Sequence, residues 1–217
     1  MTETEERRDD QGRLLERAAL RDGIPHGPLA VFAPGVGPLP VLEATLAEGR
    51  LHGPLQAREA DGTPVMRMAF RDGLPDGPAT LHQDGRLLAE LRFRAGRLHG
   101  EQRSLGPGGV LLALSRYAEG RLEGAQEVFR PDGSLLRRQE YRAGLAEGEA
   151  TEHDEAGRVT RRTPYRAGLR EGTEREYDAA GREVARTAFA ADRPLGAREV
   201  TRPAAPRRLL AWLLGDG

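Results

Sequence analysis

Seven residues with metal-binding side chains recur at a nearly constant spacing along this sequence, each directly before a glycine. They are His26, His52, Asp76, His99, Glu123, Glu147 and Glu171. Histidine and carboxylate groups are common ligands of Zn²⁺, with ligand bonds of about 2 Å. If each recurrence marks one β-hairpin, neighbouring members stand roughly 10 Å apart, because two strands advance by about 4.8 Å each. The seven residues therefore cannot share an ion. We expect solvated turn residues or, alternatively, an edge that recognises a basic partner.

No other catalytic arrangement stands out in the sequence. The chain has no cysteine, which excludes thiolate nucleophiles, thiolate metal sites and disulfides. The segment Gly106-Pro-Gly-Gly109 lacks the lysine and the following helix that a phosphate-binding loop requires. Neither a Ser-His-Asp set nor a pair of carboxylates is evident. We therefore predict a protein that is not an enzyme and that uses no metal or other cofactor.

The charge composition argues against a nucleic-acid partner. The 33 basic residues are all arginine, and 34 acidic residues bring the formal net charge to -1, whereas nucleic-acid-binding domains carry a net basic surface. Some arginines recur in the later part of the chain and could form a basic stripe for anionic lipid or an acidic protein. They are Arg137, Arg138, Arg161, Arg162 and Arg186. Glutamates are interleaved with them, so we expect cross-strand ion pairs on a solvated face, with a partner-binding stripe as the alternative.

A pair of glycines separated by three residues marks a unit that repeats along almost the whole chain. The pairs are Gly23/Gly27, Gly49/Gly53, Gly73/Gly77, Gly96/Gly100, Gly120/Gly124, Gly144/Gly148 and Gly168/Gly172, with a degraded copy at Asp192/Gly196. Successive units are 23 to 26 residues long, and most have 24. Such a period is typical of an array, in which each unit contacts only its neighbours and no single core encloses a catalytic site.

Each unit has the pattern of a strand, a tight turn, a second strand and a looser turn. A glycine near the middle of the unit, as in Asp132-Gly133, supplies the positive φ that a tight hairpin turn needs. The second strand alternates with period two, which is typical of a sheet with one buried face. Its buried side in the clearest copy carries Leu87, Ala89, Leu91 and Phe93. In later units the middle positions become polar, as at Gln139 and Thr163, so we expect the buried stripe to narrow to its two ends.

Large apolar residues three positions before each first glycine should stack into a ladder along the sheet. The ladder residues are Leu20, Leu46, Phe70, Phe93, Tyr117, Tyr141, Tyr165 and Phe189. A weaker second column contains Leu81, Leu105, Phe129 and Tyr177. Arg58 and His153 interrupt this second column, and we expect both positions to be open to solvent or to a partner.

The pattern Tyr-x-x-Gly-x-x-x-Gly identifies a family resemblance. It occurs in Tyr141-Arg-Ala-Gly144-Leu-Ala-Glu-Gly148 and again from Tyr165 to Gly172, each followed by a turn glycine in mid-unit. These units resemble MORN repeats, in particular the variant found in bacterial antitoxin-like repeat proteins, over roughly residues 12 to 200. The resemblance implies a rod of antiparallel hairpins, no catalysis, and a role in binding proteins or organising them near membranes.

The two ends of the chain depart from the repeat. Residues 1–11 are polar and acidic, so we predict a flexible terminus without a signal peptide and a cytoplasmic protein. Residues 12–202 form the array. Residues 203–217 have the pattern of a short helix that carries Trp212 behind Arg207 and Arg208. This helix would cap the last strand or, alternatively, dock on a membrane surface.

We therefore predict an all-β fold with about eight antiparallel β-hairpins in one elongated, twisted sheet, followed by a short C-terminal helix. As the resemblance implies, we expect a bacterial antitoxin or immunity-type protein that binds a toxin or effector. The first alternative is a scaffold that organises proteins at a membrane through anionic lipid, and the second is a homo-oligomer joined by terminal strands. The candidate partner-binding residues are Arg58, Arg137, His153, Arg161 and Trp212.

Overall fold

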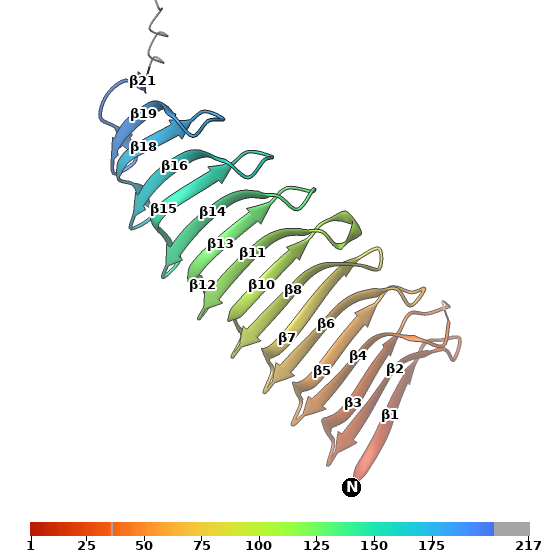
Figure 1. Cartoon of the computed structure of the whole chain (residues 1–217). Helices are drawn as coiled ribbons and strands as arrows, with labels where there is room; N and C mark the ends of the chain where they lie inside the picture. The colour runs from red at the N-terminus through yellow and green to blue at the C-terminus, as the bar shows by residue number, and fades with distance from the viewer. Residues whose placement is uncertain (36, 202–217) are drawn as a thin grey trace, which may run out of the picture.

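The computed structural model describes residues 1–35 and 37–201, which form one open antiparallel sheet of 21 strands. Successive hairpins lie side by side in sequence order, so the sheet is an elongated, twisted ribbon (Figure 1). The predicted all-β fold and its stacked hairpins are confirmed. The helix predicted over residues 203–217 lies outside the described residues.

The strands and the short 3-10 helix η1 have the following bounds: β1 (Thr2–Arg8), β2 (Leu14–Arg21), β3 (Ile24–Phe32), β4 (Pro40–Ala47), β5 (Arg50–Arg58), β6 (Pro64–Arg71), β7 (Leu74–Gln83), β8 (Arg86–Arg94), β9 (Arg97–Leu98), β10 (Gly100–Leu105), η1 (Pro107–Gly109), β11 (Leu111–Ala118), β12 (Arg121–Leu122), β13 (Gly124–Phe129), β14 (Leu135–Arg142), β15 (Leu145–His153), β16 (Val159–Arg166), β17 (Leu169–Arg170), β18 (Gly172–Tyr177), β19 (Glu183–Ala190), β20 (Arg193–Pro194) and β21 (Glu199–Val200).

The first strand differs from the flexible terminus that the sequence predicts for residues 1–11. Residues 2–8 form β1, which pairs with β2 over its whole length. Ion pairs support this pairing: Arg7 Nη2 lies 3.0 Å from Glu16 Oε2, and Arg17 Nη2 lies 2.8 Å from Glu6 Oε1. The acidic composition of residues 1–11 did not indicate a strand, because β2 supplies the groups that stabilise it. These groups are the opposite charges and the main-chain hydrogen-bond partners.

The first glycine of each pair completes the turn between one hairpin and the next. Ala143 and Gly144 have φ values of 51° and 87°. Two successive positive φ values are the requirement of a type I′ turn, whose twist matches that of the flanking strands. The same two signs recur at every connecting turn, and Asp192, with φ of 66°, takes the place of the last glycine.

The second glycine lies in a β-bulge beside a ladder residue. The register between β14 and β15 shifts between Arg138 and Glu140, and Gly148, with φ of 72°, lies in the irregular stretch of β15. On its other side Gly148 is directly opposite Tyr165. The two glycines of a pair therefore meet two separate backbone requirements, one for a turn and one for a bulge.

Aspartates stabilise the tight turns inside the hairpins. In the sequence Asp-x-x-Gly-Arg, Asp154 Oδ1 accepts hydrogen bonds from the backbone N–H groups of Ala156 (3.0 Å) and Arg158 (2.9 Å). Arg158 Nε also donates to Asp154 Oδ2 at 2.8 Å. Asp9 and Asp178 make the same three bonds in their own turns. The aspartate thus satisfies turn N–H groups that strand pairing leaves unbonded.

One hairpin turn is shorter than the rest. Asp84 and Gly85 alone connect Gln83 of β7 with Arg86 of β8, which accounts for the single 23-residue unit. The shorter turn also changes the register. Leu81 lies opposite Ala89, before the register shift of this hairpin. His82, opposite Leu87, follows the shift and so takes the position that second-column residues have in the other hairpins. The prediction that placed Leu81 in the second column is therefore wrong.

Polar residues in the middle of the second strands are among the most buried positions. Gln139 is only 1% exposed, and Ser115 and Thr163 are also buried, so the prediction that the buried stripe narrows to its ends is wrong. Neighbouring strands supply partners for two of these groups. Gln126 Nε2 donates to Ser115 Oγ at 3.1 Å, and Thr163 Oγ1 donates to Glu174 Oε2 at 2.8 Å. Cross-strand hydrogen bonds make polar side chains acceptable at these buried positions.

Candidate interaction surfaces

The ladder residues share one face of the sheet, which we call the ladder face, and they form a continuous spine on it. Each ladder residue has a cross-strand partner just after the connecting turn, such as Leu122 opposite Tyr117 and Arg170 opposite Tyr165. The guanidinium carbon of Arg170, which is opposite Tyr165 of the preceding hairpin, lies 4.0 Å from the centroid of the Phe189 ring in its own hairpin. This cation–π contact joins successive rungs.

The middle of the ladder face changes character along the array. In the N-terminal half it is mostly apolar, with Leu29, Val31, Leu42, Leu55, Met66, Met68, Leu81 and Leu91. In the C-terminal half it is mostly polar and charged, with Gln126, Arg137, Gln139, Glu152, Arg161, Thr163, Glu174 and Glu176. One face therefore presents two surfaces of different chemistry.

Two predicted site residues, Arg137 and Arg161, lie in one row of the charged half. Glu152 stands between them, directly opposite Arg137 on one side and Arg161 on the other. Arg161 Nη1 lies 3.4 Å from Glu152 Oε2, and its Nε lies 4.0 Å from Glu174 Oε1. The Nε atoms of Arg137 and Arg161 are buried and make no hydrogen bond within the described part of the chain. The structure thus brings these arginines together in a row of alternating sign.

The charged row ends at Glu176, which Arg198 binds through two hydrogen bonds. Arg198 Nε donates to Oε1 at 2.8 Å and Nη2 donates to Oε2 at 2.7 Å. This bidentate contact lowers the pKa of Glu176 and raises the pKa of Arg198. With Glu174, which lies beside the row and near Arg161, three glutamates balance the three arginines Arg137, Arg161 and Arg198.

The other recurring arginines lie on the opposite face and form ion pairs. Arg138 Nη2 lies 2.7 Å from Glu140 Oε1, Arg162 Nη1 lies 2.6 Å from Glu149 Oε1, and Arg186 Nε lies 2.9 Å from Glu199 Oε2. All three arginines are well exposed to solvent. The pairs of Arg162 and Arg186 are the cross-strand pairs that the interleaved sequence predicts, whereas Arg138 pairs with Glu140 within β14. Exposed pairs of this kind contribute only a few tenths of a kcal/mol to about 1 kcal/mol each.

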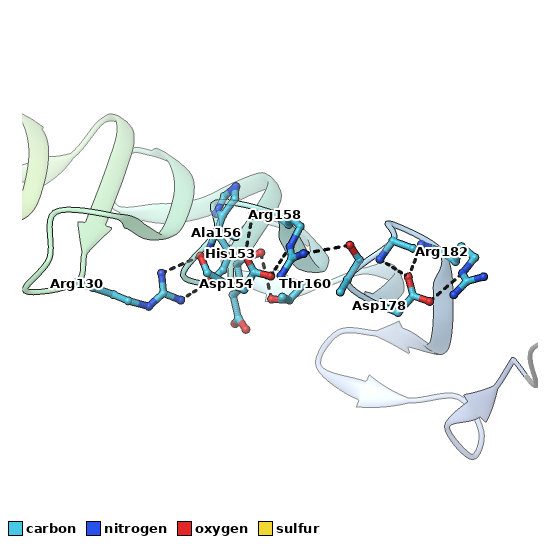
Figure 2. A network of polar contacts seen from close by, with 11 residues as sticks. Arg130, His153, Asp154, Ala156, Arg158, Thr160, Asp178 and Arg182 are labelled. Atoms are coloured by element: carbon cyan, nitrogen blue, oxygen red, sulfur yellow. Dashed lines mark hydrogen bonds and ion pairs between the residues drawn. The ribbon is translucent and has the colours of Figure 1, made fainter.

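Arg58 and His153, the predicted openings of the second column, are half-buried. Arg58 Nη1 donates to Glu43 Oε2 at 2.6 Å. The backbone carbonyl of His153 accepts a hydrogen bond from Arg130 Nη2, and that of Asp154 accepts one from Arg130 Nη1 at 3.2 Å (Figure 2). Arg58 ends β5 and His153 ends β15, several hairpins away. The two residues therefore do not belong to one site.

Six of the seven residues with metal-binding side chains connect consecutive turns, whereas His99 Nδ1 makes no hydrogen bond among the described residues. Glu123, Glu147 and Glu171 accept hydrogen bonds from the backbone N–H groups of Ala143, Ala167 and Ala191 at 2.8, 2.9 and 2.8 Å. In the N-terminal half the corresponding distances are longer, with His26 Nδ1 3.4 Å from Glu48 N and His52 Nδ1 3.5 Å from Asp72 N. Within the described residues no group of three or more such side chains could hold a metal ion.

The sequence did not predict that these side chains link one connecting turn to the next, because only solvated turn residues or a basic partner were considered. A backbone bond accompanies each side-chain bond: the N–H of Gly168 donates to the carbonyl of Ala146 at 2.8 Å, and the same bond recurs along the array. The one signal in the sequence was the constant separation between each column residue and the following turn. That separation has a meaning only once the turns are known to stack.

A surface hollow of about 710 Å³ lies over the first hairpins. Its lining includes Arg8, Arg13, Leu14, Arg17, Phe32 and Pro40. Each of the three arginines is already bound to a carboxylate, Arg13 to Asp9 and the other two to Glu6. The hollow therefore offers little uncompensated positive charge to an anionic ligand.

The described residues include no helix with the length and apolar character to cross a membrane. Trp212, the last of the predicted site residues, lies outside the part of the chain that the structure describes. The structure therefore gives the surroundings of Arg58, Arg137, His153 and Arg161 but not those of Trp212.

Comparison with known proteins does not assign the chain to a family. No family model matches the chain, and no curated protein matches it. Among solved structures, the chain is similar to one titled "Crystal Structure of TarM", with 12% sequence identity and a TM-score of 0.29. The match covers 43% of this chain and 20% of the length of that chain. Similarity at this level carries no argument about fold or activity.

Proposed function

We propose that the chain is a non-enzymatic protein-binding module and that its partner binds the ladder face. The observation that carries the proposal is the change along this face from apolar residues in β3 to β8 to the charged row of Arg137, Glu152, Arg161 and Glu176. The sheet is a single layer, so within the described residues no second layer covers these side chains. A continuous surface of this kind, apolar at one end and charged at the other, suits a protein partner.

We further infer that the partner is a toxin or effector protein. This step rests on the resemblance of the Tyr-x-x-Gly-x-x-x-Gly units to those of bacterial antitoxin-like repeat proteins. Physical support comes from the rigidity of the array, because a preformed sheet loses little conformational entropy when it binds. A membrane scaffold has less support, since Arg138, Arg162 and Arg186 of the proposed basic stripe are in ion pairs.

Two adjacent arginines of β16 give a matched test of the binding face. Arg161 lies on the ladder face and Arg162 on the opposite face, and both lie near glutamates of neighbouring strands. We expect the chain to co-purify with the product of an adjacent toxin-like reading frame, and we expect Arg161→Glu to weaken that complex by about tenfold or more. Arg162→Glu makes the same change in charge and should leave the affinity within about twofold.

Three results would contradict the proposal. If neither variant changes the affinity, or if Arg162→Glu alone weakens it, the partner does not bind the charged half of the ladder face. If anionic vesicles bind the chain while the adjacent gene product does not, a membrane scaffold replaces the antitoxin function. Melting temperatures of both variants show whether a loss of binding reflects a loss of folding.

A further inference from the structure

The outer edge of β1 is an unpaired strand edge at the start of the array. β1 (Thr2–Arg8) pairs with β2 on one side, has no strand on its other side within the described residues, and is exposed along all its seven residues. An unpaired edge presents backbone N–H and C=O groups that another strand can bind. Charged side chains on such an edge reject most incoming strands, so the order of their signs determines which strand fits.

The position of each β1 side chain follows from its partner in β2. Glu3 is opposite the ladder residue Leu20, and Arg7 is opposite Glu16. Because side chains alternate along a strand, Glu3, Glu5 and Arg7 lie on the ladder face, and Thr2, Thr4, Glu6 and Arg8 lie on the opposite face. The ladder face of β1 therefore has two negative charges followed by one positive charge.

The order of charges along β1 complements a second copy of the same strand. If two copies pair antiparallel with both ladder faces on the same side, the register that uses the whole strand places Glu5 opposite itself. Glu3 of each copy then lies opposite Arg7 of the other, and Thr4 lies opposite Glu6. The single like-charge pair in this arrangement is Glu5 with its own copy, on the symmetry axis.

We propose that two copies of the chain associate through β1, antiparallel and with Glu5 on the two-fold axis. Two Glu3–Arg7 pairs then form on the ladder face, where opposite charges directly across strands stabilise the pairing. Two-fold symmetry closes the assembly at a dimer, because each copy uses its only β1 edge. The two sheets become one continuous sheet whose ladder faces point the same way. This interface does not depend on the function proposed above.

Sedimentation of the full chain over a wide concentration range tests the dimer and its register. We expect a reversible dimer in the unmodified chain. Glu5→Gln removes the like-charge pair on the axis and should tighten the dimer several-fold. Glu3→Arg places like charges opposite each other at two symmetric positions and should weaken it by about tenfold. Glu155→Gln, in an exposed turn far from β1, makes the same change in charge as Glu5→Gln and should have no effect.

A charge swap provides a rescue. Glu3→Arg combined with Arg7→Glu restores opposite signs across the interface and should recover part of the association that Glu3→Arg removes. Arg7→Glu also breaks the contact with Glu16, so circular dichroism and thermal melting are needed to show that the double variant keeps its fold. Glu5→Gln changes no contact within the monomer among the described residues, so its result holds even if the swap unfolds β1.

Cysteine cross-linking tests the axis directly, because the chain contains no native cysteine. Residues directly opposite each other have Cα atoms roughly 4.5–5.5 Å apart, within the range of about 4.4–6.8 Å that a disulfide spans. Glu5→Cys should therefore form a disulfide-linked dimer rapidly under mild oxidation. Glu3→Cys should not, because its own copy lies four residues away along the partner strand, roughly 13 Å.

Several outcomes would overturn the proposal. A chain that remains monomeric at every concentration excludes the interface. Equal cross-linking yields for Glu5→Cys and Glu3→Cys exclude the proposed register. A dimer that neither Glu3→Arg nor Glu5→Gln alters, but that is lost when residues 203–217 are removed, forms through the other end of the array instead.

Discussion

The Glu147 side chain reaches the next connecting turn, where its Oε2 accepts a hydrogen bond from the backbone N–H of Ala167 at 2.9 Å. Ala167 has φ of 50° and is the first central residue of a type I′ turn, so this N–H points out of the turn and needs a partner. The N–H of Gly168 beside it donates to the carbonyl of Ala146. Two bonds therefore dock each connecting turn on the previous one.

Removing this contact should lower stability more than removing a neighbouring ion pair. Glu147→Ala deletes a charged acceptor of a backbone N–H, which we expect to cost about 1 kcal/mol and to lower Tm by about 2–4 °C in a chain of this size. Glu149→Ala is the control, because Glu149 forms an exposed ion pair with Arg162 that contributes less. Differential scanning calorimetry of both variants checks the prediction. Equal losses would show that the turn contact has no special weight.

Stability should fall in acid because of the hairpin-turn aspartates. The backbone N–H of Arg158, followed by its side chain, lowers the pKa of Asp154 below its usual 3.8, and Arg182 does the same for Asp178. A carboxyl whose pKa is lower in the folded state stabilises the fold above its unfolded pKa. That contribution is lost as pH falls below about 3.8 and through the folded pKa. Thermal melts from neutral pH to about pH 2.5 should therefore show a decline in Tm that begins near pH 4.

A double variant isolates the two turns. Asp154→Asn with Asp178→Asn should lower Tm at neutral pH and make the acid-induced decline shallower, because two groups with lowered pKa values no longer titrate. Asp10→Asn removes a carboxylate that makes no hydrogen bond within the described residues and should leave the profile unchanged. An acid decline of equal steepness in the double variant would assign the effect to other carboxylates.

The second glycines should differ in their tolerance of a methyl group. A Cβ at Gly77 would lie 3.0 Å from Ala69 Cβ at a φ of 118°, whereas a Cβ at Gly148 meets no atom within 4 Å at a φ of 72°. Gly148→Ala should therefore cost only the strain of a left-handed residue, about 1–2 kcal/mol. Gly77→Ala should cost more, because the neighbouring strand must also move. Urea unfolding of the two variants gives the comparison, and a larger loss for Gly148→Ala would contradict it.

Gln139 should tolerate an apolar replacement better than a charge. Its Nε2 donates to the backbone carbonyls of Glu140 (2.8 Å) and Glu147 (3.3 Å), while its buried Oε1 has no partner among the described residues. Gln139→Leu loses two hydrogen bonds but also removes this unbonded oxygen, so we expect a change of about 1 kcal/mol or less. Gln139→Glu buries a charge and should destabilise the sheet strongly, with partial recovery in acid. Melting both variants at two pH values checks this order.

Sequence reasoning succeeded where a local rule determines the structure. The ladder from Leu20 to Phe189 follows from period-two alternation, and the connecting turns follow from glycines that need positive φ. It failed where the stabilising partner lies in another unit. β1 was missed because its charges pair with β2, and the burial of Gln139 was missed because polarity alone suggests exposure. The Asp-x-x-Gly-Arg pattern, present at Asp9, Asp154 and Asp178, was visible in the sequence and would have identified those turns.

Once a partner is known, the charged row can be lengthened in fixed steps by inserting repeat units. Contacts between hairpins, such as that of Arg130 Nη1 with the carbonyl of Asp154, join adjacent units, so an extra copy of residues 145–168 can be inserted between two existing units. Each inserted copy carries its own Glu152 and Arg161 and would therefore lengthen the charged row by two strand widths, about 10 Å. The array is in this sense a molecular ruler, and the partner's affinity as a function of inserted copies would measure the length of its footprint.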